Sequence, residues 1–324
     1  MRRRAILLGG AAALALTKAS ALARREMRHH VVLVRTHSRE REPAIREFLE
    51  EMRLLGYIEG HNLEFDEMVA RKDASDLQEV VDQAIARNPD VIVAWESIAQ
   101  VVRSRTTTIP IVLPGSVDPV RAGLALSLSR PGLNVTGFAQ LNDRLPAKHI
   151  EILREIIPGL KKVGQLVDRT ASGCRVVEAH AKAAAQSMDC ALMPYYVSNQ
   201  EEIERAFASM AMDPPDALLP CPAAVLYSFR DLLFKSVLRL RIPLTSYITD
   251  NVPHGVLFAY AASLDYLYRK SAVFVDRILR GADPGELPIE QPTNFQLVVN
   301  IGTAKALGLA VPESILLRAE RITG

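Results

Sequence analysis

The feature of this chain that most constrains its fold is an alternation of short β-branched runs with longer amphipathic segments, which begins at Val31. After the first run, apolar residues recur at helical spacing until Gly56 ends the segment. Strands that alternate with such helices predict parallel sheets covered by helices on both faces. We expect two sets of five strands, at 31–36, 63–69, 91–95, 109–113 and 135–139, and at 162–168, 191–197, 216–221, 242–248 and 255–261.

The predicted fold class is therefore α/β, with two doubly wound parallel-sheet lobes. Residues after 261 remain once both sheets are complete: a helix over 263–280, a proline-rich connector, a strand at 295–300, and an ending expected to be helical with a break at Pro312. The economical interpretation is that the chain crosses back between the lobes and forms a hinge of several crossovers. We expect residues 29–140 with about 263–292 to form the first lobe, and 141–262 with about 293–324 to form the second.

The N-terminus has the order of regions found in a secretory signal peptide. Arginines at positions 2–4 precede an apolar stretch over 5–16, and small residues follow up to Ala23. The apolar stretch is shorter than the roughly 20 residues that span a bilayer. We therefore expect residues 1–23 to be a cleaved signal peptide, by the general secretory or the twin-arginine route, and the mature protein to be periplasmic. The cleavage region lacks the acceptor cysteine of a lipoprotein, so no lipid anchor is expected.

Length and charge restrict the function classes. A chain of 324 residues exceeds what one hydrophobic core supports, which also favours two lobes. The formal net charge of +2 gives no reason to expect nucleic acid as a partner. We expect a monomer that binds a small molecule.

The three cysteines make an odd count for an exported protein, so at least one free thiol is expected. Cys174 and Cys190 lie near opposite ends of a predicted helix, which places them too far apart to pair. We interpret all three, including Cys221, as small packing residues.

Motifs of the common α/β enzymes are missing from the sequence. The first strand ends without the glycines of a dinucleotide-binding turn, and no phosphate loop, nucleophile elbow or HExxH pair occurs. The seven histidines have no metal-like spacing. We therefore expect neither a cofactor nor a metal ion.

Three stretches resemble one family. They are TTTIPIVLPGSVDPVRAGLALSLSRPGLNVTGF at 106–138, GYIEGHNLEFD at 56–66, and PIEQPTNFQLVVNIGTAKALGLAVPESILLRAERI at 288–322. They are similar to the ABC transporter substrate-binding family that includes the tryptophan and aromatic amino acid binding proteins. The resemblance implies a periplasmic-binding-protein-like type I fold, a ligand cleft between two lobes, docking onto an inner-membrane ABC permease, and no catalysis. The turns at 95–97, 168–172 and 220–224 depart from the family pattern, so the pocket is individual.

Ligands of parallel α/β sheets bind at the carboxyl ends of the strands. The candidate ligand-binding residues are therefore Thr36, His37, Ser38, Trp95, Glu96, Ser97, Gly115, Ser116 and Asp118 from the first lobe, and Asp168, Ser172, Tyr247 and Tyr260 from the second.

Several of these candidates have a structural alternative. Asp118, which precedes Pro119, suits the cap of a helix that we expect to start there. Trp95 suits either core packing or a stacking surface for a ligand. Glu96 suits either a solvated loop or a partner for a ligand ammonium group. Tyr247 and Tyr260 also suit the interior of the second lobe.

The function that we predict is the solute-binding component of an ABC importer, with an amino acid or small carboxylate as ligand. One alternative is an epimerase- or racemase-like enzyme, in which Glu96 and either Asp168 or His37 form an acid–base pair. Another is a ligand-sensing domain.

Overall fold

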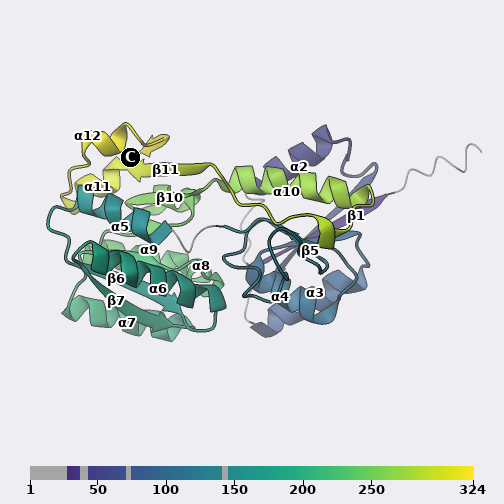
Figure 1. The fold of residues 1–324 in the computed structure, drawn as a ribbon. Coiled ribbons are helices and arrows are strands. Elements are labelled where there is room, and N and C mark those ends of the chain that lie inside the picture. The colour runs from purple at the N-terminus through teal and green to yellow at the C-terminus, as the bar shows by residue number, and fades with distance from the viewer. Residues whose placement is uncertain (1–27, 37–42, 71–73, 141–144) are drawn as a thin grey trace, which may run out of the picture.

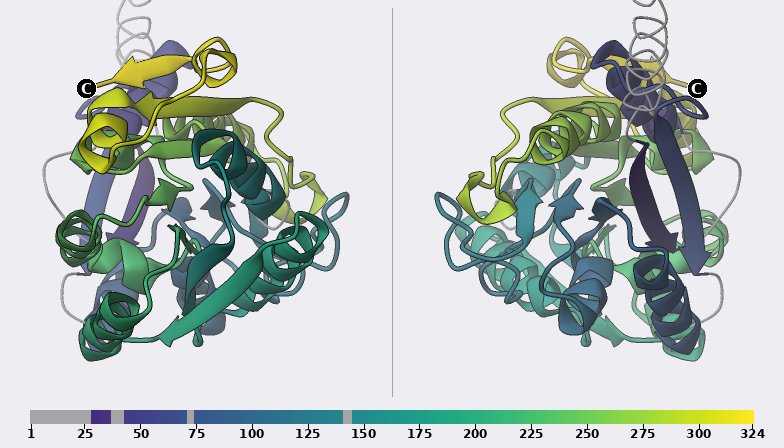
Figure 2. Two further views of the ribbon diagram at one scale, coloured as in Figure 1. Left: turned by 90° about the vertical axis from the view of Figure 1, so that its left-hand side faces the viewer. Right: turned by 90° about the vertical axis from the view of Figure 1, so that its right-hand side faces the viewer.

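The structure is a computed structural model that describes residues 28–36, 43–70, 74–140 and 145–324. The expected signal peptide, together with His37 and Ser38, lies outside the described residues. The molecule consists of two lobes that lie side by side (Figure 1). Figure 2 views it from each end, with the second lobe in front on the left and the first lobe in front on the right.

The first lobe is built on a five-stranded parallel sheet in the order β2-β1-β3-β4-β5. Helices cover both of its faces, α2 and α10 on one and α3 and α4 on the other. The elements are β1 (His29–Thr36), β2 (Leu63–Ala70), β3 (Val91–Ala94), β4 (Ile111–Leu113), β5 (Val135–Gly137), α2 (Pro43–Leu54), α3 (Ala74–Ala86), α4 (Glu96–Arg105) and α10 (Leu264–Leu279).

The central strand β1 explains why this lobe has helices on both faces. Val31 and Leu33 pack in the cluster that contains α2 and α10, whereas Val32 and Val34 pack in the cluster that contains α3 and α4. Successive side chains of a strand point to opposite faces, so a continuous apolar run requires a cover on each side. The prediction of an α/β fold with parallel sheets is confirmed.

The second lobe contains a three-stranded parallel sheet, β7-β6-β8, and a four-stranded sheet, β12-β11-β10-β9. A bridge between Leu218 and Leu244 connects the two sheets. The strands are β6 (Lys162–Asp168), β7 (Ala191–Val197), β8 (Ala217–Pro220), β9 (Thr245–Ser246), β10 (Phe258–Ala262), β11 (Phe295–Asn300) and β12 (Arg321–Thr323). The helices are α5 (Leu145–Ile156), α6 (Ser172–Ser187), α7 (Gln200–Met212), α8 (Ala224–Ser228), α9 (Arg230–Leu240), α11 (Ile301–Leu307) and α12 (Glu313–Leu316), with the 3₁₀ turn η2 (Thr249–His254). A second 3₁₀ turn, η3 (Pro284–Glu286), lies in the first lobe beside β5.

The five strands predicted for the second lobe are present as β6 to β10, and their pairings are parallel, but two further strands extend its sheets. β11 pairs antiparallel with β10, and the C-terminal residues expected to be helical include the strand β12. α11 ends at Gly308, whose φ of 75° lies in the left-handed region. β12 is short and mostly exposed, so it carries none of the apolar alternation by which a strand is recognised in a sequence.

The helix expected to begin at Asp118 is also absent. Residues 119–123 form turns instead, and the backbone at Gly123 has a φ of 74°. A left-handed residue there ends the helical path after about one turn.

The chain crosses between the lobes twice within the described residues. After β10 the chain returns to the first lobe as α10, which packs beside α2 (Figure 1). Tyr57 donates a hydrogen bond to Asp276 Oδ1 at 3.0 Å, and Arg269 forms an ion pair with Glu47. After η3 the chain comes back to the second lobe, where β11 pairs with β10.

Cys174 and Cys221 form a disulfide, with their Cα atoms 5.7 Å apart, and Cys190 is a buried free thiol. The interpretation of all three as packing residues is therefore wrong for the first two. Pairing needs Cα atoms within about 7 Å, and the tertiary packing of α6 against the end of β8 provides that separation. The expectations that Cys174 does not pair with Cys190 and that one thiol is free are confirmed.

No helix within the described parts of the chain is long and apolar enough to cross a membrane.

Candidate functional site

A cavity of about 240 Å³ lies between the lobes. Its first-lobe wall comes from residues at and after the ends of β1, β3 and β4, as expected for the carboxyl ends of parallel strands. Its second-lobe wall comes from residues after β8, from α8 and α9, and from residues in and after β9.

A large part of the predicted ligand-binding residues line this cavity. Asp118, Asp168 and Tyr260 lie outside its wall. Ser172 begins α6, but its side chain is outside the described part of the structure, as are His37 and Ser38. The predicted residues that line the cavity are Thr36, Trp95, Glu96, Ser97, Gly115, Ser116 and Tyr247.

Trp95 provides an aromatic surface in the first-lobe wall. Its Nε1 donates a hydrogen bond to Tyr268 Oη at 3.0 Å, so α10 orients the indole ring. A Cβ atom on Gly115 would lie 2.5 Å from Trp95 Cζ3. Only glycine allows the backbone to approach the ring this closely.

Glu96 holds the turn that follows β4. Its Oε2 accepts hydrogen bonds from Ser116 Oγ, from the Val117 N–H at 2.7 Å and from the Asp118 N–H at 3.2 Å. Burial raises the pKa of Glu96 above its ordinary value, although these donors act in the opposite direction. The structure thus gives the carboxylate a structural role that the sequence did not indicate.

The two aspartates outside the cavity wall accept local hydrogen bonds. Asp118 Oδ1 accepts from the Arg121 N–H at 2.9 Å, which is a capping contact of the kind anticipated for this residue. Asp168 is buried, and its Oδ1 accepts from the Thr170 N–H at 2.8 Å and from Thr170 Oγ1 at 2.7 Å.

Tyr247 and Tyr260 belong to the interior of the second lobe, around His149. The Tyr247 ring lies 4.6 Å from the imidazole centroid, and His149 Nε2 is 2.9 Å from the backbone oxygen of Tyr260. Burial lowers the pKa of His149 to about 4. Neither His149 Nδ1 nor Tyr247 Oη has a hydrogen-bond partner among the described residues.

Several lining residues were not predicted, because the prediction considered only residues at the carboxyl ends of strands. Tyr268 reaches the cavity from α10, which crosses back from the second lobe. Tyr227 lies in α8 and Arg230 is the first residue of α9, and neither directly follows a strand. Arg35, by contrast, directly precedes the candidate Thr36 at the end of β1.

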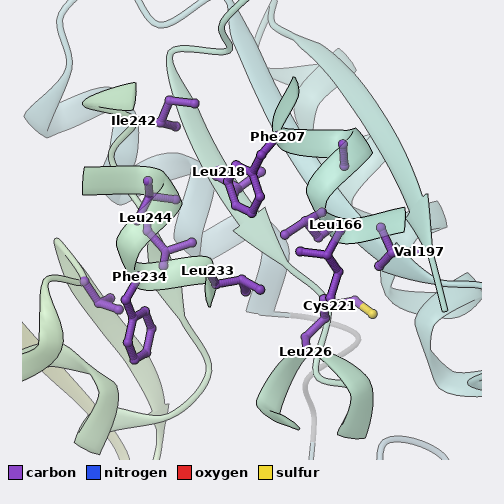
Figure 3. Close-up of a cluster of buried hydrophobic side chains, with 14 of the residues drawn as sticks. Leu166, Val197, Phe207, Leu218, Cys221, Leu226, Leu233, Phe234, Ile242 and Leu244 are labelled. Atoms are coloured by element: carbon purple, nitrogen blue, oxygen red, sulfur yellow. The ribbon is translucent and has the colours of Figure 1, made fainter. Parts of the chain in front are cut away.

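The second-lobe wall is largely apolar. Figure 3 shows Leu226, Leu233, Phe234 and Leu244 within the buried cluster of this lobe. All four also line the cavity, so the cavity extends into the edge of that core.

The lobes touch beside the cavity. Val117, from the first-lobe turn held by Glu96, packs against the core of the second lobe. A Cβ atom on Gly173, the second residue of α6, would lie 3.0 Å from Val117 Cβ. The lobes are therefore in close contact at this point.

One group of residues outside the cavity brings metal-ligating atoms together. Atoms of His30, Glu64 and Asp66 lie within 4.8 Å of one another among the described residues. Asp66 already forms an ion pair with Arg87 and lies 3.0 Å from His30 Nε2. A guanidinium on the same carboxylate takes the place that a cation would occupy.

Comparisons with known proteins agree with this architecture. A tyrosine-binding protein of Clostridioides difficile is 24% identical over 264 residues, which are 81% of this chain and 75% of that protein. A conserved domain protein of Vibrio cholerae has a solved structure with a TM-score of 0.83 and 26% identity, covering 91% of this chain and 99% of that one. The structure of an ABC domain in complex with L-Trp from Streptococcus pneumonia has a TM-score of 0.82 and 22% identity, with the same coverage.

The similarity to these structures confirms the periplasmic-binding-protein-like fold that the resemblance implied. Residues 32–323 match the family of ABC transporter substrate binding proteins. This match covers nearly all of the described chain. The family is one of extracytoplasmic proteins that bind small-molecule ligands and a permease. The chain belongs to the ABC transporter substrate binding protein family.

Proposed function

We propose that this protein captures an amino acid or a small carboxylate with an aromatic or apolar body, and delivers it to an ABC permease in the inner membrane. The observation that carries the proposal is the cavity between the lobes, in which Trp95 and an apolar wall face a few polar and charged groups. Ligand sites are typically apolar with a small number of placed polar groups. The volume of about 240 Å³ is slightly below the roughly 300 Å³ at the lower end of such sites, which favours a small ligand.

The relatives support the same ligand class. The C. difficile relative is a tyrosine-binding protein, and the S. pneumonia structure holds L-Trp. Aromatic surface from Trp95 and Tyr268 suits the ring of such an amino acid. Glu96 is the candidate partner for its ammonium group, through the Oε1 atom that does not accept the bonds of the turn.

The arrangement of the carboxylates favours binding over catalysis. An epimerase or racemase needs an acid and a base on opposite sides of the substrate. Asp168, the proposed second member of such a pair, lies outside the cavity wall and its Oδ1 accepts two local hydrogen bonds.

A thermal-shift screen of the purified mature protein tests the ligand class. Tyrosine, tryptophan, small carboxylates and neutral sugars are compared at equal concentrations. A ligand at 100 times its Kd adds about 2.7 kcal/mol to the free energy of unfolding. We expect stabilisation by an aromatic amino acid, and stabilisation by sugars alone would reject the proposal.

The proposal includes export and action as a monomer in the periplasm. The basic, apolar and small-residue regions of residues 1–23 support cleavage near Ala23. Mass spectrometry of periplasmic protein tests the cleavage, and light scattering tests the monomer. An intact N-terminus recovered with the membrane fraction would contradict cleavage.

A further inference from the structure

Arg230 differs from the other charged residues of the cavity because no ion pair within the described part of the protein accounts for its charge. Three charged side chains line the cavity: Arg35, Glu96 and Arg230. Arg35 Nε donates to Glu67 Oε1 at 2.5 Å, and Glu96 accepts hydrogen bonds from residues 116–118. Arg230 has no hydrogen bond or ion pair with the residues that the structure describes, and its Nη1 is buried.

The surroundings of Arg230 hold its guanidinium in place but provide no hydrogen-bond acceptor for it among the described residues. The Cζ atom lies 4.3 Å from the ring centroid of Tyr227, which is a cation–π contact. Such a contact orients the guanidinium plane but occupies none of its in-plane N–H donors. The nearby wall residues Leu226, Leu233 and Phe234 offer no acceptor side chain. A buried N–H donor without an acceptor is costly, so an anion that accepts from Nη1 relieves a cost that is already present.

The location of Arg230 adds to this effect. It is the first residue of α9, an 11-residue helix, and therefore lies at the positive end of the helix dipole. The one acidic side chain among the residues lining the cavity, Glu96, is bonded to the first-lobe turn. The second-lobe side of the cavity is consequently left with a positive charge that no described residue neutralises.

We infer that Arg230 is the anion-binding residue of the cavity and that it receives the carboxylate of the ligand as a bidentate ion pair. The inference rests on the proposed function for the existence of a small ligand with a carboxylate, and it adds which residue recognises that carboxylate. Arginine suits this role because its planar fork matches the two oxygens of a carboxylate.

The inference also gives the ligand an orientation. Its carboxylate lies against α9 in the second lobe, and its body extends toward Trp95 in the first lobe. A ligand held at both ends connects the lobes, and its binding energy then favours their closed arrangement.

Titration calorimetry with three related probes tests the inference. Tyrosine, tyramine and phloretic acid share the same phenol, but tyramine lacks the carboxylate and phloretic acid lacks the ammonium group. We expect the wild type to bind tyrosine and phloretic acid and to reject tyramine. Arg230→Gln should weaken binding of both acids by roughly 10- to 150-fold, the range for a hydrogen bond to a charged group.

Two variants control for charge and folding. Arg230→Lys keeps the charge but loses the planar fork, so its affinity should lie between those of the wild type and Arg230→Gln. Arg239→Gln removes an exposed arginine of the same helix that does not line the cavity, and it should bind like the wild type. Melting of unliganded Arg230→Gln checks that the variant folds.

The outcomes separate this inference from the proposed function. Equal tyrosine affinity in wild type and Arg230→Gln, or equal affinity of the wild type for tyramine and tyrosine, overturns the role of Arg230 and leaves the aromatic ligand intact. If the wild type binds none of the three probes, the aromatic ligand is wrong, and Arg230 is judged on the hits of the thermal-shift screen. A carboxylate hit that Arg230→Gln loses supports the role, whereas a neutral sugar or amine bound equally by both proteins overturns it.

Discussion

Trp95 Nε1 donates a hydrogen bond to Tyr268 Oη at 3.0 Å, and this bond ties the end of β3 to the helix that crosses back from the second lobe. Tyr268→Phe removes the acceptor and leaves the indole N–H without it. We expect the free energy of unfolding to fall by about 1 kcal/mol or more. Trp95 is the single tryptophan of the chain, so urea unfolding followed by its fluorescence measures the loss and also reports its environment.

Tyr266→Phe is the matched control for this variant. Its ring packs against Phe138, but its hydroxyl has no hydrogen-bond partner among the described residues. Equal destabilisation by the two variants would show that the bond to Trp95 contributes nothing.

Glu96 is expected to affect stability before any ligand is added. Glu96→Gln replaces a carboxylate that accepts three hydrogen bonds with a neutral amide, and bonds to an ionised group are stronger. We expect a loss of about 1.5 to 3 kcal/mol in the unliganded protein at pH 7, measured by urea unfolding. Ser116→Ala, which removes one donor, should cost less. An unchanged unfolding curve for Glu96→Gln would contradict the structural role of Glu96 and leave it a role in ligand binding alone.

The disulfide between Cys174 and Cys221 closes a loop with a sequence separation of 47 residues. The chain-entropy relation for such a loop gives about 4 kcal/mol of stabilisation. The double variant Cys174→Ala/Cys221→Ala should lose about this amount, whereas Cys190→Ala keeps the disulfide and should lose much less. Thiol titration of the unfolded, unreduced wild type should count one free thiol, and a count of three would contradict the disulfide.

His149 makes stability depend on pH. Burial lowers its pKa from 6.5 to about 4, so between these values the unfolded chain binds a proton that the folded protein does not. Stability is therefore fully present above pH 6.5 and is lost as the pH falls toward 4. From the two pKa values we expect a loss of about 2 kcal/mol between pH 7 and pH 5.

His149→Gln removes the titrating group while keeping a donor near the Tyr260 carbonyl. Urea unfolding at both pH values should show a smaller difference for this variant than for the wild type. The same difference in both proteins would assign the pH dependence to other groups.

Gly173 and Val117 lie at the contact between the lobes. A Cβ atom at position 173 would be 3.0 to 3.3 Å from the side chain of Val117, so Gly173→Ala should hold the lobes apart. We expect small-angle scattering to show a more open molecule and calorimetry to show weaker ligand binding. Val117→Gly in the same chain removes the Cβ atom that the added methyl group would meet at 3.0 Å, and it should restore both. No change in either measurement for Gly173→Ala would mean that this contact does not limit closure.

The sequence by itself determined the layered α/β fold and one wall of the site. In β1, the continuous apolar run from Val31 to Val34 requires packing on both faces, and that demand is local to the strand. Trp95, Glu96 and Ser116 were found because every parallel strand of a sheet ends at the same edge.

Only the tertiary structure decided which remote segments meet. Cys174 pairs with Cys221 because α6 packs against the end of β8, and Tyr268 reaches Trp95 because α10 crosses back between the lobes. Arg230 has no periodic signature, since it reaches the cavity from the start of a helix. Residue periodicity reports which side of an element is buried. It does not report what that side is buried against, because that depends on the packing of elements that lie far apart in the chain.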